Sequence, residues 1–298
     1  MLQMKSFNYF DFNVILKLEL KLDLELVLLP MKLKTFAVLF ILFISSEVFS
    51  QDTLLINAKY IPHTDTTLVF YPNNYNADNS YPLLFMLHGY SGNYKQWNDI
   101  TNLDSVANKD GFIIVCPDGF YDSWYVDSPM KKNSQYETFF FKNLVPEIFK
   151  KYNIDKKNIF ITGLSMGGYG AMYYYLKHTD FFRSAGSTSG ILDITAFPNN
   201  WGMPKVFGSL TLHQKTWENH SDLYLLNKLK IKNKKIIVDC GTDDFSFKVN
   251  QAFADSCKQL GINIDFITSP GNHNYQYWRK SILKQFEFFK NIIDNENK

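Results

Sequence analysis

The sequence predicts an α/β fold in a single domain, with a mostly parallel central sheet, antiparallel strands at its N-terminal side and helices on both faces. Short, wholly apolar runs recur along the chain, and several of them end at glycine or at a Pro-Asp-Gly turn. Segments with helical periodicity separate these runs, and such alternation indicates a parallel sheet covered on both faces. After residue 51, no internal repeat and no Pro/Gly/Ser-rich linker divides the chain.

Residues 31–50 are typical of a secretory signal peptide. Met31 is followed by Lys-Leu-Lys, by a short apolar stretch and then by Ser-Ser-Glu-Val-Phe-Ser-Gln. A basic start and small residues near a polar exit are features of such leaders, and the apolar stretch is short for a bilayer span. We expect cleavage after Ser50, a secreted or periplasmic location, and no stable membrane insertion of the mature protein.

Residues 1–30 precede this leader, whereas a signal peptide ordinarily opens a chain. We interpret Met31 as the start of translation and residues 1–30 as an upstream extension that was assigned in error. The alternative is a long pre-sequence, or a signal anchor that stays in the membrane. The remaining residues, 51–298, are expected to form the catalytic domain.

Strands and helices are expected to alternate through this domain. Residues 54–61 and 66–71 carry alternating or β-branched residues and are expected to pair as antiparallel strands. The apolar runs predict five buried strands at 82–87, 112–116, 158–162, 235–239 and 264–268. Helical periodicity predicts helices at 95–108, 134–152, 166–178, 246–260 and 274–293. Residues 191–234 show no clear period and are expected to form a small cap that shapes specificity.

A G-x-S-x-G motif spans residues 163–167, with Ser165 at its centre. An apolar strand precedes the motif and a helix follows it, which is the context of the nucleophile elbow in the α/β-hydrolase fold. Four of the eight residues 163–170 are glycine, although each glycine inside a helix costs about 1 kcal/mol. Close backbone packing around a strained turn explains them. We therefore predict that Ser165 is the nucleophile of a serine ester hydrolase.

A serine nucleophile needs a base, and the chain order in this fold is serine, acid, histidine. Of the six histidines, only His273 follows the last expected strand, at the sheet edge where open α/β sheets bind ligands. We predict His273 as the base. The acid should follow the preceding strand, where Asp239 is expected to lie inside the strand. Asp243 and Asp244 both lie beyond its end, and spacing alone does not choose between them.

Acyl transfer also needs backbone N–H groups directed at the developing oxyanion. We assign these to Met166, directly after the nucleophile, and to Tyr90, in the loop after an earlier strand. His88 opens the same loop and is expected to brace it. Two aromatic residues of another loop, Trp124 and Tyr125, and Trp201 of the expected cap are candidates for lining the substrate site.

Cysteines, metal-binding motifs and charge exclude several classes of function. Cys116, Cys240 and Cys257 form no C-x-x-C pair, and the first two lie in apolar runs, so we expect buried free thiols. There is no metal-ligand spacing such as H-E-x-x-H, and we expect no metal and no cofactor. The net charge of +2 indicates no nucleic-acid partner. The sequence carries no signal for an oligomeric state.

These motifs together resemble the esterase D family, which includes tributyrin-type esterases, S-formylglutathione hydrolases and feruloyl esterases. The resemblance spans residues 81–289 and rests on the segments 87–93, 163–171, 240–245 and 271–273. In the family the acid directly precedes an aromatic residue in a Gly-Thr-x-Asp-Phe turn, which maps onto Asp244 and favours it over Asp243. Ser246 departs from the family pattern, which commonly has leucine there.

We expect a secreted serine carboxylic-ester hydrolase that uses Ser165, Asp244 and His273 on short-chain acyl esters or on carbohydrate-linked acetyl or feruloyl esters. Secreted members of the resembled family often act on esters of plant or dietary carbohydrates. A small-molecule or carbohydrate ester is therefore the expected partner. The alternatives are an acyltransferase to a sugar or lipid acceptor with the same triad, and a non-catalytic carbohydrate-binding relative.

Overall fold

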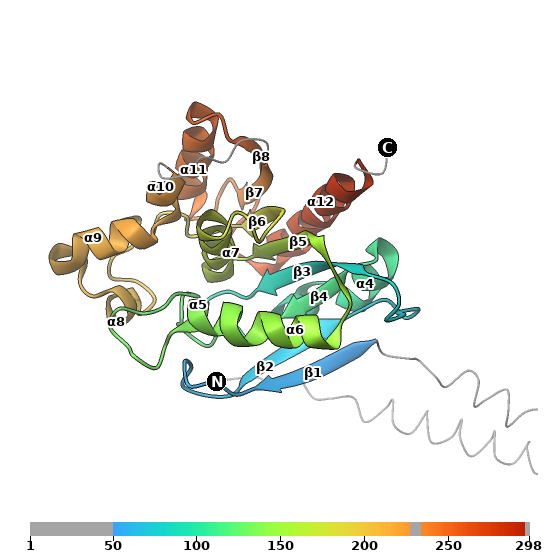
Figure 1. Ribbon diagram of the computed structural model, residues 1–298. Coiled ribbons are helices and arrows are strands. Elements are labelled where there is room, and N and C mark those ends of the chain that lie inside the picture. The colour runs from blue at the N-terminus through green and yellow to red at the C-terminus, as the bar shows by residue number, and fades with distance from the viewer. Residues whose placement is uncertain (1–49, 227–233, 296–298) are drawn as a thin grey trace, which may run out of the picture. The chain divides into compact units, whose positions relative to one another are not determined.

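The computed structural model describes residues 50–226 and 234–295. Its internal contacts divide the chain into Met1–Phe49 and Ser50–Lys298. The first unit lies outside the described residues, and with it lie the expected extension 1–30 and all but the last residue of the expected leader. The second unit, Ser50–Lys298, contains every described residue (Figure 1).

An eight-stranded sheet forms the centre of this unit, in the order β1-β2-β4-β3-β5-β6-β7-β8. Pairing is antiparallel between β1 and β2 and between β2 and β4, and it is parallel between all other neighbours. The mostly parallel α/β sheet with antiparallel N-terminal strands is therefore confirmed. The strands are β1 (Gln51–Ile56), β2 (Asp65–Phe70), β3 (Tyr81–Leu87), β4 (Ile113–Cys116), β5 (Ile154–Gly163), β6 (Ser184–Thr188), β7 (Lys235–Gly241) and β8 (Asn263–Ser269).

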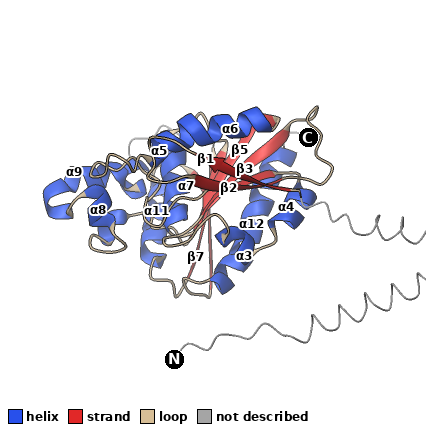
Figure 2. Ribbon diagram, turned by 90° about the horizontal axis from the view of Figure 1, so that it is seen from below, coloured by secondary structure: helices blue, strands red, loops and turns tan. Residues whose placement is uncertain are grey.

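Helices cover both faces of the sheet, which explains why the central strands are apolar on both sides (Figure 2). One apolar cluster joins the sheet to α3, α4 and α12, and the other joins it to α5, α6, α7 and α11. The bounds are α3 (Gln96–Ile100), α4 (Leu103–Asp110), α5 (Tyr136–Phe139), α6 (Val145–Lys151), α7 (Met166–Lys177), α11 (Phe247–Gln259) and α12 (Tyr275–Asp294).

Two expected helices are interrupted. The helix expected at 95–108 is divided into α3 and α4, because the side chain of Asn102 accepts a hydrogen bond from the Ser105 N–H and starts a new helix there. The helix expected at 134–152 is α5 and α6 joined by a π-helical turn, Phe140–Leu144.

The sequence analysis missed β6. Its sequence, Ser-Ala-Gly-Ser-Thr, lacks the large apolar residues that mark the other strands. The strand is nevertheless wholly buried, and a Cβ on Gly186 would lie 2.1 Å from the side chain of Gln285 on α12. Small residues are required here because the helices approach β6 closely, and this requirement is visible only in the tertiary structure.

The described part of the segment expected as a cap contains a single 3₁₀ turn, Ile194–Ala196, and three short α-helices between β6 and β7. They are α8 (Met203–Phe207), α9 (Leu210–His220) and α10 (Asp222–Leu225), and residues 227–233 of the segment lie outside the described part. His213 has non-helical backbone angles within α9. Short helices with such a kink explain why no long period is visible in the sequence.

The three thiols are free and buried, as expected. Burial raises the pKa of Cys240 and of Cys257 to about 12, and it also raises that of Cys116. A thiol with such a raised pKa stays protonated at neutral pH and is a poor nucleophile.

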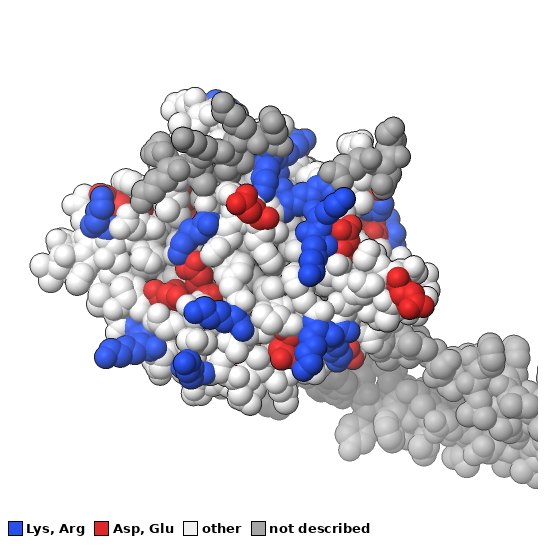
Figure 3. Space-filling view, in the orientation of Figure 1, with Lys and Arg blue, Asp and Glu red and all other residues white. Residues whose placement is uncertain are grey.

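Charged side chains of both signs are interspersed over the face of the molecule that Figure 3 presents. This mixture agrees with the small net charge of the chain. Across residues 50–226 and 234–295, no helix has both the length and the apolar character needed to cross a membrane.

Candidate active site

Ser165 lies on the turn between β5 and α7, in a backbone conformation that is rare for a residue with a side chain. Its φ and ψ are 54° and −118°, and its N–H donates to the carbonyl oxygen of Thr188 at 2.9 Å. A Cβ on Gly163 would lie 2.2 Å from the Gly167 carbonyl oxygen, and one on Gly167 would lie 2.1 Å from the Leu87 carbonyl oxygen. Only glycine fits at these two positions, and the resulting tight turn holds Ser165 at the carboxyl end of β5.

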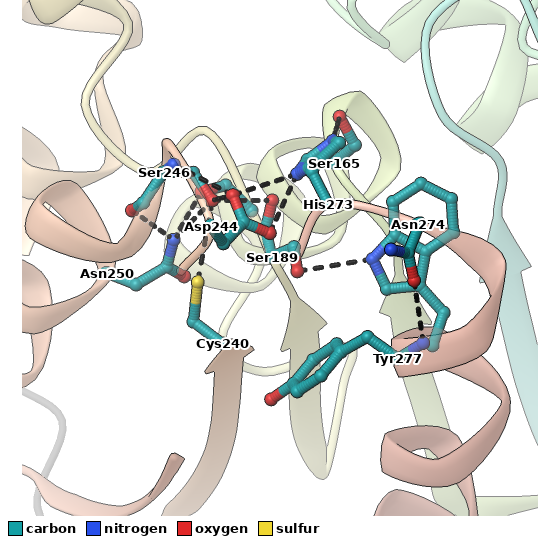
Figure 4. Close-up of polar contacts among 11 residues, drawn as sticks. Ser165, Ser189, Cys240, Asp244, Ser246, Asn250, His273, Asn274 and Tyr277 are labelled. Carbon is teal, nitrogen blue, oxygen red and sulfur yellow. Dashed lines mark hydrogen bonds and ion pairs between the residues drawn. The ribbon is translucent and has the colours of Figure 1, made fainter. Parts of the chain in front are cut away.

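His273 lies between the side chains of Ser165 and Asp244 (Figure 4). Its Nε2 is 2.9 Å from Ser165 Oγ, and its Nδ1 is 3.0 Å and 2.9 Å from the two carboxylate oxygens of Asp244. With the proton on Nδ1, the ring donates to the carboxylate and accepts from the serine hydroxyl. The three side chains come from the ends of β5, β7 and β8, in the chain order expected from the sequence.

The turn after β7 separates the two candidate acids. Asp244 is buried, with 5% of its surface exposed, and it faces His273. Asp243 is exposed to solvent, and its N–H donates to the carbonyl oxygen of Gly271 at 3.0 Å. Of the two neighbours, Asp244 is therefore the one beside the imidazole.

Asp244 is held in its ionised form. Burial opposes its charge, but the hydrogen bond and charge of His273 and two hydrogen bonds from Ser246 outweigh burial and lower the pKa of Asp244. Every group within hydrogen-bonding distance of its oxygens is a donor or can act as one. A carboxylate that only accepts fits this surrounding better than a carboxylic acid does.

Two aromatic rings flank His273, and the sequence analysis assigned neither of them to the site. The Phe245 ring lies 4.4 Å from the imidazole, and the Trp278 ring lies edge-on at 5.0 Å. The indole N–H of Trp278 donates to Ser189 Oγ at 3.2 Å, which fixes its orientation. The position of Phe245 directly after the acid was a usable signal, whereas Trp278 lies within a helix and carries no local signature.

The loop after β3 runs beside Ser165. A Cβ on Gly89 would lie 3.5 Å from the Cβ of Ser165, and the Gly89 N–H donates to Gln96 Oε1 at 2.8 Å. No hydrogen-bond acceptor is found for the N–H of Tyr90 or of Met166 in the part of the chain that the structure describes. Met166 begins α7 directly after Ser165, and Tyr90 follows Gly89 in the loop that approaches Ser165. Unpaired N–H groups at these two places suit the binding of a developing oxyanion.

His88 has the surroundings of a brace for this loop. Its ring is buried, with Nδ1 at 2.7 Å from the Gly89 carbonyl oxygen, and its Nε2 accepts from the Gly119 N–H at 2.8 Å. Because Nε2 accepts from the Gly119 N–H, Nδ1 is the ring nitrogen that donates to the Gly89 carbonyl oxygen. The ring joins the loop after β3 to the loop after β4.

The three aromatic residues expected to line the substrate site occupy different environments. Trp124 and Tyr125 are core residues with 1% and 0% of their surfaces exposed. Tyr125 donates from its hydroxyl to the His88 carbonyl oxygen at 2.9 Å, and its ring packs against Gly119 and Gly170. In this structure both side chains support the loops from within and offer no surface to a substrate, which corrects the expected lining role. Trp201 is only partly buried.

Among the described residues, no group of three or more His, Cys, Asp or Glu side chains is arranged to hold a metal ion. The chemistry that the site itself supports is nucleophilic acyl transfer. A serine hydroxyl is paired with a base, the base is oriented by a carboxylate, and the N–H of Met166, directly after the serine, has no acceptor among the described residues.

Comparisons with known proteins agree with this chemistry. The family model described as "Putative esterase" matches residues 60–289. The chain is 29% identical over 229 residues to an acetyl esterase of Caldicellulosiruptor saccharolyticus, an alignment that covers 71% of this chain and 84% of that protein. A solved ferulic acid esterase is 26% identical with a TM-score of 0.67, covering 81% of this chain and 96% of that one.

The fold has further relatives at lower identity. FphF, a fluorophosphonate-binding serine hydrolase of Staphylococcus aureus solved with substrate bound, is 22% identical with a TM-score of 0.71. The match covers 80% of this chain and 98% of that structure. This likeness confirms the fold that the context of the G-x-S-x-G motif predicts.

Proposed function

We propose a substrate class and a catalytic triad for this chain, which belongs to the Esterase family, an esterase D-like group of α/β-hydrolases. The chain is a serine esterase. The proposed substrates are short-chain acyl esters and acetyl or feruloyl esters linked to carbohydrate. The proposed catalytic residues are Ser165, Asp244 and His273. The observation that carries the proposal is the 2.9 Å contact between His273 Nε2 and Ser165 Oγ, with Asp244 on the other ring nitrogen.

In the proposed reaction, His273 takes the hydroxyl proton as Ser165 Oγ attacks the ester carbonyl carbon. The tetrahedral oxyanion is stabilised by the N–H groups of Tyr90 and Met166, which have no acceptor within the described residues. His273 then protonates the leaving alcohol, and an acyl group remains on Ser165. Water attacks the acyl-enzyme with His273 again as base, which releases the acid and restores the serine.

Asp244 is proposed to keep the imidazole in the tautomer with the proton on Nδ1 and to stabilise the imidazolium that forms in each step. Its lowered pKa supports this role, because the carboxylate must stay ionised throughout the working pH range. The strained backbone of Ser165 presents its hydroxyl above the sheet, where an ester can approach it.

Aromatic surface beside the triad supports the preference for flat acyl groups or sugars. Phe245, with 49% of its surface exposed, lies over His273, and its ring is 5.5 Å from that of Trp201 and 5.9 Å from that of Phe197. Aromatic faces of this kind pack against other rings. Two relatives of this chain, an acetyl esterase and a ferulic acid esterase, support the same range.

Residues 31–50 support the further proposal that the enzyme is secreted or periplasmic, with its signal peptide removed after Ser50. Mass spectrometry of the protein recovered from the culture fluid or periplasm of its natural host tests this. A peptide that begins at Gln51 is the expected result. A peptide that covers residues 7–17 would contradict both the start at Met31 and the cleavage.

The decisive experiment for the triad is Ser165→Ala with p-nitrophenyl acetate. Loss of the nucleophile is expected to lower kcat by about 10⁵- to 10⁶-fold, whereas activity near the parent level would end the proposal. A panel of acetyl, butyryl and feruloyl esters, free and on xylan, identifies the acyl group. Product analysis with added alcohol acceptors separates hydrolysis from transfer, and no turnover of any ester would indicate a non-catalytic binding protein.

A further inference from the structure

Ser246 makes contacts to Asp244 that the proposed chemistry does not by itself require. The residue directly precedes α11 and is wholly buried. Its N–H and its hydroxyl oxygen both lie 2.8 Å from Asp244 Oδ1. His273 Nδ1 is 2.9 Å from the other carboxylate oxygen, Oδ2, and 3.0 Å from Oδ1. Ser246 thus holds the carboxylate at Oδ1, while the imidazole contacts Oδ1 and Oδ2 at nearly equal distances.

The hydroxyl proton of Ser246 has three acceptors within reach, and Asp244 is the strongest of them. Asp244 Oδ1 lies at 2.8 Å, the Ser189 carbonyl oxygen at 3.4 Å and Cys240 Sγ at 3.5 Å. A hydrogen bond to an ionised carboxylate is shorter and stronger than one to a neutral acceptor. The proton is therefore directed to Asp244.

Asn250, one turn along α11, favours the same orientation of the Ser246 hydroxyl proton. Its side-chain Nδ2 lies 2.8 Å from the Gly190 carbonyl oxygen, 2.9 Å from the Ser246 carbonyl oxygen and 3.3 Å from Ser246 Oγ. The two carbonyl oxygens fix the amide with its NH₂ group toward Ser246, because the opposite orientation would set oxygen against oxygen. The two hydrogens of Nδ2 serve three acceptors, so the longest contact, to Ser246 Oγ, shares a hydrogen with a carbonyl oxygen. A donor on this side of Oγ leaves the serine proton free to point at the carboxylate (Figure 4).

We infer that Ser246 is a positioning residue of this esterase: its hydroxyl, oriented by Asn250, fixes the rotation of the Asp244 carboxylate and through it the placement of His273. The inference rests on the proposed triad. It concerns a side chain that touches neither substrate nor the reacting atoms. Two donors on Oδ1 also draw negative charge away from Oδ2, so they moderate how strongly Asp244 holds the imidazole proton.

The other titratable groups around Asp244 do not hide the effect of Ser246 on the imidazole proton. On β7, the Cys240 thiol stays neutral because burial raises its pKa to about 12. Burial raises the pKa of Asp239 to about 6, but this carboxyl is bonded to Thr188 and Gln285 and is the same in every variant. Asp243 is exposed in the same turn, and Tyr277 on α12 is a phenol whose pKa burial raises. His273 is the remaining group, and it is the one that the measurement reports.

The test compares Ser246→Ala and Ser246→Thr in the full chain, with kcat, KM and the pH profile of kcat/KM measured on p-nitrophenyl acetate. Ser246→Ala is expected to lower kcat about tenfold with KM within about twofold of the parent. The acid limb of the profile should move to higher pH by about half a unit, because the carboxylate without its donor holds the imidazole proton more tightly. Ser246→Thr keeps the hydroxyl and should restore both values.

Ser184→Ala is the matched control. Ser184 is also buried, and its hydroxyl donates to the Lys235 carbonyl oxygen. It lies at the start of β6, at the end of the strand away from Ser165. This variant loses a buried hydroxyl and should keep the parent pH profile even if its Tm falls. Asn250→Ala is a second probe that leaves Ser246 in place, and it should move the acid limb in the same direction by less.

An acid limb that stays at the parent position in both Ser246→Ala and Asn250→Ala would overturn the inference, as would a loss of kcat that only follows the folded fraction. Ser165→Ala and Asp244→Asn are measured beside them. If those two retain activity, the proposed triad fails. If they are inactive while Ser246→Ala matches the parent, the triad stands and only the role of Ser246 is lost.

Discussion

Two adjacent aspartates after β7 have different surroundings, and the difference is large enough to measure. Asp244 is buried against His273, whereas Asp243 is exposed. We expect Asp244→Asn to lower kcat by about 10⁴-fold, as the loss of an orienting carboxylate does in other serine hydrolases. The amide cannot stabilise an imidazolium, and its NH₂ group favours the wrong imidazole tautomer. Steady-state kinetics on p-nitrophenyl acetate at pH 8 provides the measurement.

Asp243→Asn is the matched control for this prediction. The variant changes the same charge one residue away, at a side chain that solvent surrounds. We expect kcat/KM within about twofold of the parent. Undiminished activity in Asp244→Asn together with a loss in Asp243→Asn would reverse the assignment of the acid.

Single residues of the site differ in how far the sequence could predict them. Ser165 was predicted from the context of its motif and His273 from its place in the chain order. Both signals can be recognised in the sequence without a structure. The choice of Asp244 needed a family resemblance, because two neighbouring residues at a strand end satisfy spacing equally. Ser246 stood out only as a departure from the family pattern, and its hydrogen bonds to Asp244 depend on how α11 packs against the end of β7.

The turn between β5 and α7 allows a prediction about a whole element. In Gly167→Ala, the new Cβ would lie 2.1 Å from the Leu87 carbonyl oxygen and 2.5 Å from that of His88, both backbone atoms. The end of β3 must then move, together with the loop that carries the Tyr90 N–H. We expect kcat/KM on p-nitrophenyl acetate to fall by about 10²-fold or more, the effect of losing an oxyanion donor.

Gly111→Ala separates this effect from general backbone strain. Gly111 ends α4 with a left-handed φ of 75°, and a Cβ there meets nothing within 4 Å. The substitution should destabilise the protein by about 1–2 kcal/mol while leaving kcat/KM unchanged. If activity falls in proportion to stability in both variants, close packing of the turn has no special role in catalysis.

Among the elements, those with strong local patterns were predicted and those shaped by neighbours were not. The runs that became β3, β5 and β7 are apolar whatever surrounds them. β6 is composed of small residues because α12 approaches it, with Gln285 against Gly186. The break between α3 and α4 follows from a single cap at Asn102. Because Asn102 also fits the helical period of its neighbours, the sequence pattern does not show the break.

At the scale of the whole molecule, Asp65 should make stability depend on pH. Burial raises its pKa from 3.8 to about 7, with Thr67 and Tyr136 bonding to its carboxyl group. The folded protein therefore binds a proton that the unfolded chain releases near pH 4, and its stabilising contribution is lost as the pH rises to about 7. The free energy of unfolding should fall over this window by about 1.4 kcal/mol for each pKa unit.

Asp65→Asn should remove the part of this dependence that belongs to Asp65, because an amide replaces the protonated carboxyl group, and should leave the part that belongs to Asp239. Its NH₂ group can donate to Tyr136, whose own hydroxyl lies 2.9 Å from the Asp118 carbonyl oxygen. We expect the variant to be more stable than the parent at pH 8 and similar at pH 4, as measured by urea unfolding. Asp78→Asn, at an exposed site, should follow the parent curve. Parallel curves for Asp65→Asn and the parent would contradict the buried proton.

The position of β8 has a consequence for the chain during its synthesis. β8 is the final strand along the sequence and the last in the sheet order, and the loop after it brings His273 to Ser165. A ribosome completes the serine turn more than a hundred residues before it reaches the histidine. On the proposed triad, the growing polypeptide would carry a hydroxyl without its base and would not yet hydrolyse esters. Hydrolysis would then begin only when the C-terminal segment has docked, so the order of synthesis would delay activity.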